Sequence, residues 1–315
     1  PYVTSYYERR WGFCMSHDEK SRLPKGKYRV FIDSTLSDGT LDLLHGVIKG
    51  KSSREIFFSS YVCHPSMANN ELSGPVILSA LMRYVTQQYP NSNLSYRFTL
   101  QPETIGTIAC LSRFLPDMKR NVHSGFVLTC VGDDGGYSHV QSRSGDCTAD
   151  KALQAALIGL ENFNTYSYLQ RGSDERQYCA PGVDLPVCTF CRTKFESFPE
   201  YHTSADNFDI VTASGLAGSF EVMKTIIDAF ELGEFPHVSV VGEPQLGKRG
   251  LYPSLSLKGS TDHMASRLNL LAYADGNTSI FDLAAIIQQP LKTILEEYRI
   301  LKDAGLVEGR VESLV

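Results

Sequence analysis

The sequence predicts an α/β protein with a three-layer domain, in which helices cover both faces of a mixed sheet, followed by a winged helix-turn-helix. Strand-like and helix-like segments alternate from Arg54 to Phe230, a pattern typical of a sheet covered by helices. Beyond Glu234 the pattern changes to three helix-like segments and a short extended tail. We therefore divide the chain into residues 1–52, 53–235 and 236–315.

Residues 1–52 predict part of a small β subdomain. Residues 28–32 and 43–48 alternate apolar and polar side chains, as half-buried strands do, and Asp38-Gly39 between them is a turn signal. Two strands alone are unstable and need further partners. The chain begins at Pro1 without a methionine, so we expect it to be part of a longer or processed protein.

The central region contains four expected strands that alternate with four expected helices. Ser73 is placed to cap the first helix, and Pro75 to open it at its first position. The expected strands are residues 55–63, 96–100, 125–132 and 185–191, and the expected helices are 75–88, 102–115, 149–159 and 213–230. This order predicts one sheet with helices on both faces.

Polar and acidic residues recur next to the expected strands. In open α/β sheets, ligand sites collect at the carboxyl edge of the strands. The residues are His64, Glu103, Asp133, Asp134, His202 and Asp206 after strands, and Asp174 and Glu175 before one. Two histidines with several carboxylates at one edge predict a hydrolytic metal site.

Composition excludes several classes of partner. The formal net charge of −5 gives no field that would attract nucleic acid or anionic membrane. No apolar run approaches the roughly 18 residues of a membrane span. The eight cysteines are scattered, mostly in apolar runs, which favours free thiols in a reducing cytoplasm. Cys188 and Cys191 form one C-x-x-C inside an expected strand, where the thiols would point in different directions.

A series of motifs in fixed order carries a family resemblance. The segments are PYVTSYYERRWGFC, IDSTLSDGTL, CHPSMANNELSG, PETIGTIA, VLTCVGDDG, GSDERQYCAPGVDLPV and PEYHTSADN. With them the chain resembles the co-catalytic zinc aminopeptidases of the M28 type. It is more closely similar to a family of bacterial aminopeptidase-like proteins (the DUF4910/DUF2172 type) with a C-terminal winged helix, often encoded near polysaccharide biosynthesis genes. Family members also carry an N-terminal segment that is absent here.

The resemblance implies a role for each matching residue. His64 takes the position of the first zinc-ligand histidine, and His202, in a Y-H-T-x-x-D context, that of the last. Asp133 takes the position of an aspartate ligand, with Asp134 as the alternative. Glu103 takes the position of the general base.

Two positions depart from the peptidase pattern. Asn70 stands where a metal-bridging aspartate is expected, and Thr104 replaces a carboxylate ligand. A neutral amide oxygen is a weaker zinc ligand than a carboxylate, and two dications about 3.5–4 Å apart need anions around them. We therefore expect one zinc ion per chain, bound by His64, Asp133 and His202, with Asn70 as an auxiliary ligand. An engineered aspartate-to-asparagine change would give the same sequence.

The resemblance also implies a mechanism. Zinc would polarise the scissile carbonyl and activate water, and Glu103 would move the proton to the leaving amine. Asp206 would either orient a ligand imidazole or cap a helix. Substrate groups would be bound by Asp174 or Glu175 if they are amines, or by Arg143, Arg176 or Arg192 if they are carboxylates.

We therefore predict a cytoplasmic zinc-dependent hydrolase that cleaves an amide bond of a peptide or aminoacyl-type substrate. One alternative, favoured by Asn70 and Thr104, is a protein that binds such a ligand without turnover. Another is a DNA-binding regulator. The last helix carries Lys292, Arg299 and Lys302 but also three acidic residues, so it lacks the basic surface of a DNA reader. We expect the winged helix to pack against the central domain, to form a dimer or to bind a partner protein. The protein could therefore form a homo-oligomer.

Overall fold

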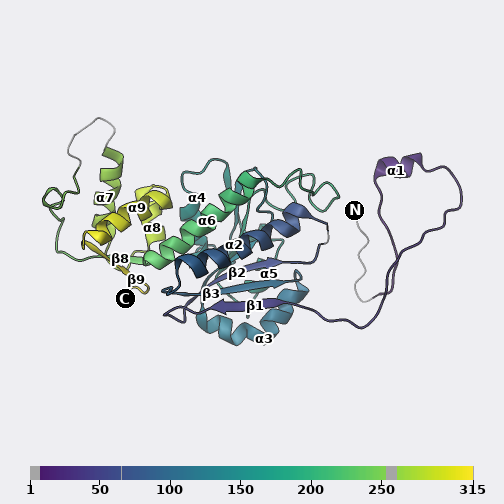
Figure 1. The fold of residues 1–315 in the computed structure, drawn as a ribbon, viewed down its shortest axis with the longest axis horizontal. Coiled ribbons are helices and arrows are strands. Elements are labelled where there is room, and N and C mark those ends of the chain that lie inside the picture. Colours follow the sequence, from purple (N-terminus) through teal and green to yellow (C-terminus); the bar gives the residue numbers. More distant parts are fainter. Residues whose placement is uncertain (1–7, 65, 253–260, 315) are drawn as a thin grey trace.

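A seven-stranded sheet forms the centre of the structure (Figure 1). The structure is a computed structural model that describes residues 8–64, 66–252 and 261–314. Within these residues the strand order is β1-β3-β2-β4-β7-β5-β6. The strands are β1 (Leu44–Ile48), β2 (Glu55–Tyr61), β3 (Ser95–Gln101), β4 (Val122–Leu128), β5 (Tyr137–Val140), β6 (Phe163–Tyr166) and β7 (Val187–Cys191).

The sheet is mixed, as predicted. β3, β2, β4 and β7 run parallel to their neighbours in this order, whereas β1 pairs antiparallel with β3 and β5 pairs antiparallel with β7. β2, β4 and β7 are buried almost throughout, as expected for central parallel strands that are covered on both faces. Because the four parallel strands end at the same edge, the loops that follow them meet there.

Helices cover both faces of the sheet and complete the predicted three layers (Figure 1). One face is covered by α2 (Ser73–Gln88), α4 (Thr148–Leu157) and α6 (Ala213–Leu232), and the other by α3 (Ile105–Asn121) and the short α5 (Glu175–Tyr178). Neighbouring β2 residues serve the two layers, since Phe58 packs on the first side and Phe57 on the second. Short 3-10 turns η2 (Tyr168–Gln170) and η3 (Gly247–Arg249) lie in loops.

The N-terminal prediction needs correction. Residues 28–32 form no strand. The described residues 8–43 contain only the short helix α1 (His17–Arg22), on an arm that reaches away from the body (Figure 1). The second expected strand is β1, which joins the main sheet through β3, with Leu44 opposite Leu100. Residues 8–52 therefore form no separate β subdomain, because the strand partner that β1 needs is supplied by the central domain.

The C-terminal region is the predicted winged helix-turn-helix. Its helices are α7 (Thr261–Tyr273), α8 (Ile280–Ile287) and α9 (Leu291–Asp303), and β8 (Phe235–Val238) pairs antiparallel with β9 (Val307–Arg310). The side chain of Ser279 caps α8 by accepting the N–H of Asp282. α8 and α9 pack into the core that α4 and α6 share. None of the helices in the described part of the chain is long and apolar enough to cross a membrane.

Candidate functional site

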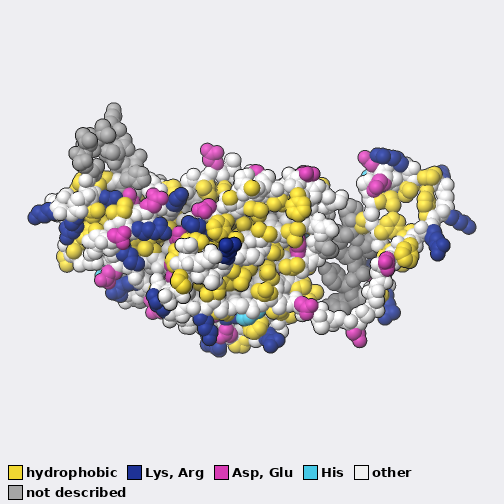
Figure 2. Space-filling model, in the orientation of Figure 1, with side chains coloured by type: hydrophobic (Ala, Val, Ile, Leu, Met, Phe, Trp, Pro, Cys, Tyr) yellow, Lys and Arg dark blue, Asp and Glu magenta, His cyan; other side chains and the backbone are white. Residues whose placement is uncertain are grey.

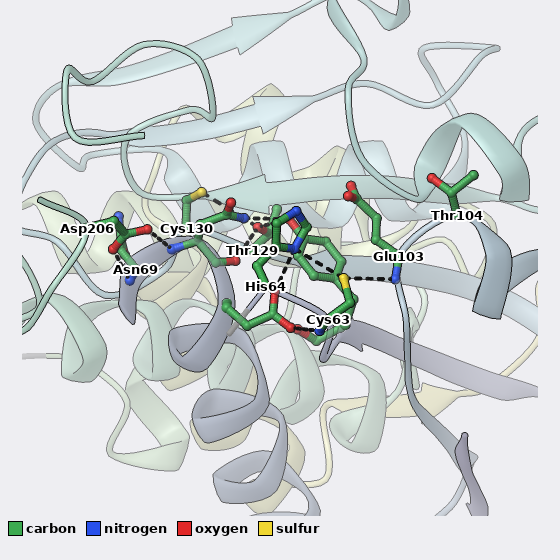
Figure 3. A network of polar contacts seen from close by, with 12 residues as sticks. Cys63, His64, Asn69, Glu103, Thr104, Thr129, Cys130 and Asp206 are labelled. Atoms are coloured by element: carbon green, nitrogen blue, oxygen red, sulfur yellow. Dashed lines mark hydrogen bonds and ion pairs between the residues drawn. The ribbon is translucent and has the colours of Figure 1, made fainter. Parts of the chain in front are cut away.

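A buried carboxylate fixes the loop between β2 and α2. This loop contains a π-helical turn, η1 (Ala68–Leu72), directly before α2. Asp206 Oδ1 accepts the backbone N–H groups of Ala68 and Asn69 at 3.1 and 2.6 Å, and Oδ2 accepts that of Asn70 at 2.9 Å (Figure 3). A negative charge at the first N–H groups of a helix is stabilising. Of the two roles expected for Asp206, these contacts show the capping role.

The turn directs Glu71 towards His64. Glu71 Oε2 lies 3.1 Å from His64 Nδ1, and Oε1 accepts the backbone N–H of Cys63. Cys63 Sγ lies 3.1 Å from the same Nδ1 atom (Figure 3). These two neighbours, Cys63 first and Glu71 second, raise the pKa of His64 to about 10. The surroundings of His64 therefore favour a positive charge.

The second predicted histidine lies beside the first. The ring centroids of His64 and His202 are 5.1 Å apart, and the ring of Tyr201 stacks on His202 at 4.0 Å. His202 has a left-handed backbone, with φ of 55°, a conformation that costs energy and is found preferentially at functional sites. Burial and then the charge of His64 lower the pKa of His202.

Asn70 has one buried side-chain atom without a partner. Its Nδ2 donates to the Tyr61 hydroxyl at 3.0 Å, and that hydroxyl lies 2.5 Å from Thr129 Oγ1. Asn70 Oδ1 accepts no hydrogen bond from the described residues. A buried acceptor without a donor is unfavourable, so this oxygen is free to meet a ligand.

Asp133 is held by other groups. Its Oδ1 accepts hydrogen bonds from Gly135 N and Thr193 Oγ1 at 2.8 and 2.6 Å, and its Oδ2 from Asn69 Nδ2 and Thr193 N at 2.9 and 3.2 Å. The alternative ligand, Asp134, is exposed, and its Oδ1 accepts a hydrogen bond from Ser214 Oγ at 2.7 Å. Asp133 therefore ties the loops after β4 and β7 together.

The predicted ligand set does not form a compact group. Among the described residues, two groups of His, Cys, Asp or Glu have all ligand atoms within 4.8 Å of one another, and neither combines His64 with Asp133 or His202. The groups are Cys63–His64–Glu71 and His139–Asp150–Cys188. The ligand prediction did not include Cys63 and Glu71. Their only sequence signal is the nearness of both to His64 in the segment CHPSMANNE.

Glu103 and Asp174 form an acidic pair beside His64. Burial first and the charge of Asp174 second raise the pKa of Glu103 to about 7. Asp174 is fully buried, and burial raises its pKa to about 6 although its Oδ1 accepts the N–H of Thr104 at 2.8 Å. A carboxyl group whose pKa is raised by burial and by a nearby carboxylate suits proton transfer near neutral pH. Thr104 itself has φ of 62°, another strained residue at this edge (Figure 3).

The raised pKa of Glu103 predicts how stability of the metal-free protein depends on pH. Because the folded-state pKa of about 7 exceeds the ordinary value of 4.5, folding favours the protonated carboxyl group. This stabilising contribution is complete below about pH 4.5 and is lost as pH rises through about 7. From about pH 5 to pH 8, Glu103→Gln, which does not ionise, is expected to gain about 2 kcal/mol in unfolding free energy relative to the wild type. Urea unfolding measures this difference, and a pH-independent difference would contradict the raised pKa.

Two predicted substrate-binding residues have structural contacts instead. Glu175 is buried, and its carboxylate accepts Thr189 Oγ1 at 2.7 Å and the N–H groups of Gly172 and Ser173. Arg192 is buried, and its guanidinium lies over the ring of Tyr137. It donates to three backbone carbonyls, those of Gly135, Gly136 and Gly215. Neither side chain is free to bind a substrate.

The other two arginines lie at opposite edges of the sheet. Arg143 pairs with Asp184, which precedes β7 and lies at the amino edge, away from His64. Arg176 is exposed and donates to Thr104 Oγ1 at 2.6 Å. Its charge partly offsets the rise in the pKa of Glu103 that burial and Asp174 cause. Of the predicted arginines, Arg176 is therefore the cation beside the acidic pair.

Comparisons with known proteins cover nearly the whole chain. A family model described as a domain of unknown function (DUF4910) matches residues 19–233, a winged helix-turn-helix model matches 235–309, and a second domain of unknown function (DUF2172) matches 1–35. One relative is a Clostridium acetobutylicum protein whose name describes a polysaccharide biosynthesis protein with an aminopeptidase-like domain. It is 36% identical to this chain over 289 residues. The match covers 90% of this chain but 65% of that protein, so the chain spans less than two thirds of this relative.

Solved structures agree with the fold. One solved structure is that of a Clostridium acetobutylicum protein whose name describes it as a peptidase. It matches with a TM-score of 0.85 and 34% identity, and the match covers 98% of this chain and 70% of the other. An aminopeptidase from Aneurinibacillus sp. strain AM-1 has a TM-score of 0.50 and 17% identity, covering 59% of this chain and 47% of the other. The second likeness concerns the fold alone.

Proposed function

The chain belongs to the DUF4910 family of aminopeptidase-like proteins, and we propose that it is a metal-dependent hydrolase that cleaves an amide bond of a small peptide or aminoacyl-type substrate. The observation that carries this proposal is the acidic pair of Glu103 and Asp174 beside two adjacent imidazoles at the carboxyl edge of the sheet. A carboxyl group with a pKa near 7 is suited to act as a general base.

The donor atoms at this edge fit one zinc ion rather than two. His64 and His202 are adjacent, and the buried Asn70 Oδ1 lacks a partner. Asn70 and Thr104 are neutral where a two-zinc site would need carboxylates. A bound zinc ion would polarise the scissile carbonyl and lower the pKa of a water molecule.

The chain's own residues then account for the proton transfers. Ionised Glu103 accepts a proton from the attacking water and returns it to the leaving amine. Asp174 is fully buried, so it acts on the pKa of Glu103 and not on the substrate. The exposed Arg176 is placed to pair with a substrate carboxylate. The eight unpaired cysteines support a cytoplasmic location.

Metal removal tests the proposal. Chelation of the purified protein is expected to lower hydrolysis of aminoacyl amides and aminoacyl p-nitroanilides by at least about 10²-fold, because water activation and carbonyl polarisation are both lost. Activity should return at about one equivalent of zinc. A requirement for two equivalents would contradict the single site, and stoichiometric zinc without turnover of any substrate would contradict hydrolysis.

The second candidate, ligand binding without turnover, is favoured by the neutral Asn70 and Thr104. DNA binding has less support. In α9, Arg299 lies 3.4 Å from Asp228, and Lys302 donates to the carbonyl of Leu232 at 2.8 Å. On the face that Figure 2 shows, basic and acidic side chains are interspersed over the winged helix. These contacts with α6 favour the packing role.

A further inference from the structure

The proposed metal site lacks an obvious source of negative charge. His64 and His202 are neutral as ligands, and Asn70 offers a neutral amide oxygen. Both oxygens of Asp133 already accept hydrogen bonds, two from Thr193 and one each from Asn69 and Gly135. A divalent cation bound by neutral groups alone is poorly stabilised in a partly buried site.

A thiol and a carboxyl group lie against His64. Cys63 Sγ and Glu71 Oε2 are each 3.1 Å from His64 Nδ1, and the three ligand atoms all lie within 4.8 Å of one another. Zinc binds sulfur at about 2.3 Å and nitrogen or oxygen at about 2.0–2.2 Å, so two ligands at a tetrahedral angle lie roughly 3.3–3.6 Å apart. The observed spacing is close to that geometry.

We propose that Cys63, His64 and Glu71, in place of His202 and Asn70, are the protein ligands of the metal ion, with the Cys63 thiolate and the Glu71 carboxylate supplying the charge that Asn70 and Thr104 do not. This inference rests on the proposed function and names the ligands of its metal. It leaves a fourth position for water. The backbone N–H of Glu103 donates to Cys63 Sγ at 3.3 Å. The backbone of the proposed general base therefore contacts the proposed thiolate ligand.

The π-helical turn explains why the carboxylate is at residue 71. Asp206 holds the N–H groups of residues 68–70, which fixes the direction of each side chain in η1. Asn70 then faces Tyr61 and Glu71 faces His64. The anionic group that the peptidase pattern places at residue 70 is therefore supplied by the next residue along the chain.

The other compact group is a weaker candidate. His139, Asp150 and Cys188 are fully buried, so an ion has no access from solvent. Asp150 also accepts hydrogen bonds from His139 and from Ser142 and Cys147 backbone N–H groups. These contacts already occupy the oxygens of the Asp150 carboxylate. In the Cys63–His64–Glu71 group, by contrast, Cys63 is exposed to solvent.

Zinc content and cobalt substitution test the ligand set without relying on activity. Cys63→Ser and Glu71→Gln are each expected to weaken zinc binding at least about 10-fold, measured by elemental analysis and competition with a chelator. The Co²⁺ form of the wild type should show a thiolate-to-cobalt charge-transfer band that Cys63→Ser lacks. Cys14→Ser, which changes another exposed cysteine, is the matched control and should behave as wild type.

Several outcomes would overturn the ligand set. These are wild-type zinc affinity in both variants, a cobalt form without the thiolate band, or loss of zinc in Cys188→Ala but not in Cys63→Ser. Thermal unfolding of the metal-free variants checks their fold; if the buried Glu71 is needed for folding, the exposed Cys63 carries the test. Zinc that depends on Cys63 and Glu71 without any hydrolysis would support the ligand set and overturn only the proposed function.

Discussion

Glu103→Gln is expected to lower kcat/KM for amide hydrolysis by about 10²–10⁴-fold, the usual contribution of a general base. Glutamine keeps the shape of the side chain but does not accept the proton of water. The backbone contact of Glu103 with Cys63 Sγ is unaffected by the side chain, so zinc content should remain that of the wild type. Steady-state kinetics together with elemental analysis measure both quantities.

The control for this variant is Glu161→Gln, which removes the charge of an exposed glutamate away from the acidic pair. It should leave kcat/KM unchanged. Retention of more than about a tenth of the wild-type activity in Glu103→Gln would show that another group accepts the proton. Loss of zinc along with activity would show that Glu103 binds the metal, which is a different role from the one we propose.

The regular elements near the site could be predicted because the sequence signal is local and long. β2 is buried on both faces and reads as one apolar run, and α2 has sixteen residues with helical spacing. The predicted helix cap was wrong. Ser73 was expected to cap α2, but it is the first residue of the helix, and its hydroxyl group donates to the backbone carbonyl of Asn69. The reason is that the π-helical turn before Ser73 continues directly into α2.

The elements that were missed are short or depend on distant partners. β5 and β6 have four residues each, too few to show a period of two. β6 is mostly exposed and lacks an apolar run altogether. The four-residue α5 depends on Asp174 and Glu175 being buried against β7 and α3, which no local pattern reveals.

The site shows the same division between local and distant information. The sequence placed His64, Glu103 and His202 after strands, and the structure has them at one edge of the sheet. It did not indicate that Asp133 is held by Thr193, or that Glu71 faces His64. The first contact joins loops that are far apart in sequence. The second depends on a π-helical turn, a rare conformation without a recognised sequence signature.

Asp206→Ala is expected to lower the unfolding free energy by on the order of 3 kcal/mol, because three backbone N–H groups would lose a buried charged acceptor. Urea unfolding measures the loss. Asp209→Ala, an exposed aspartate near Asp206, is the control and should cost less than about 0.5 kcal/mol.

The same variant connects the fold to the metal site. The hydrogen bonds of Asp206 go to residues 68–70 and not to Glu71. Asp206 nevertheless fixes the turn that directs Glu71 towards His64. Asp206→Ala should therefore weaken zinc binding at least about 10-fold, as loss of an outer contact typically does, and increase hydrogen exchange at residues 68–70. A stability loss without any change in zinc affinity would show that Glu71 keeps its direction independently of η1, and the ligand set would then depend on the Cys63–His64 segment alone.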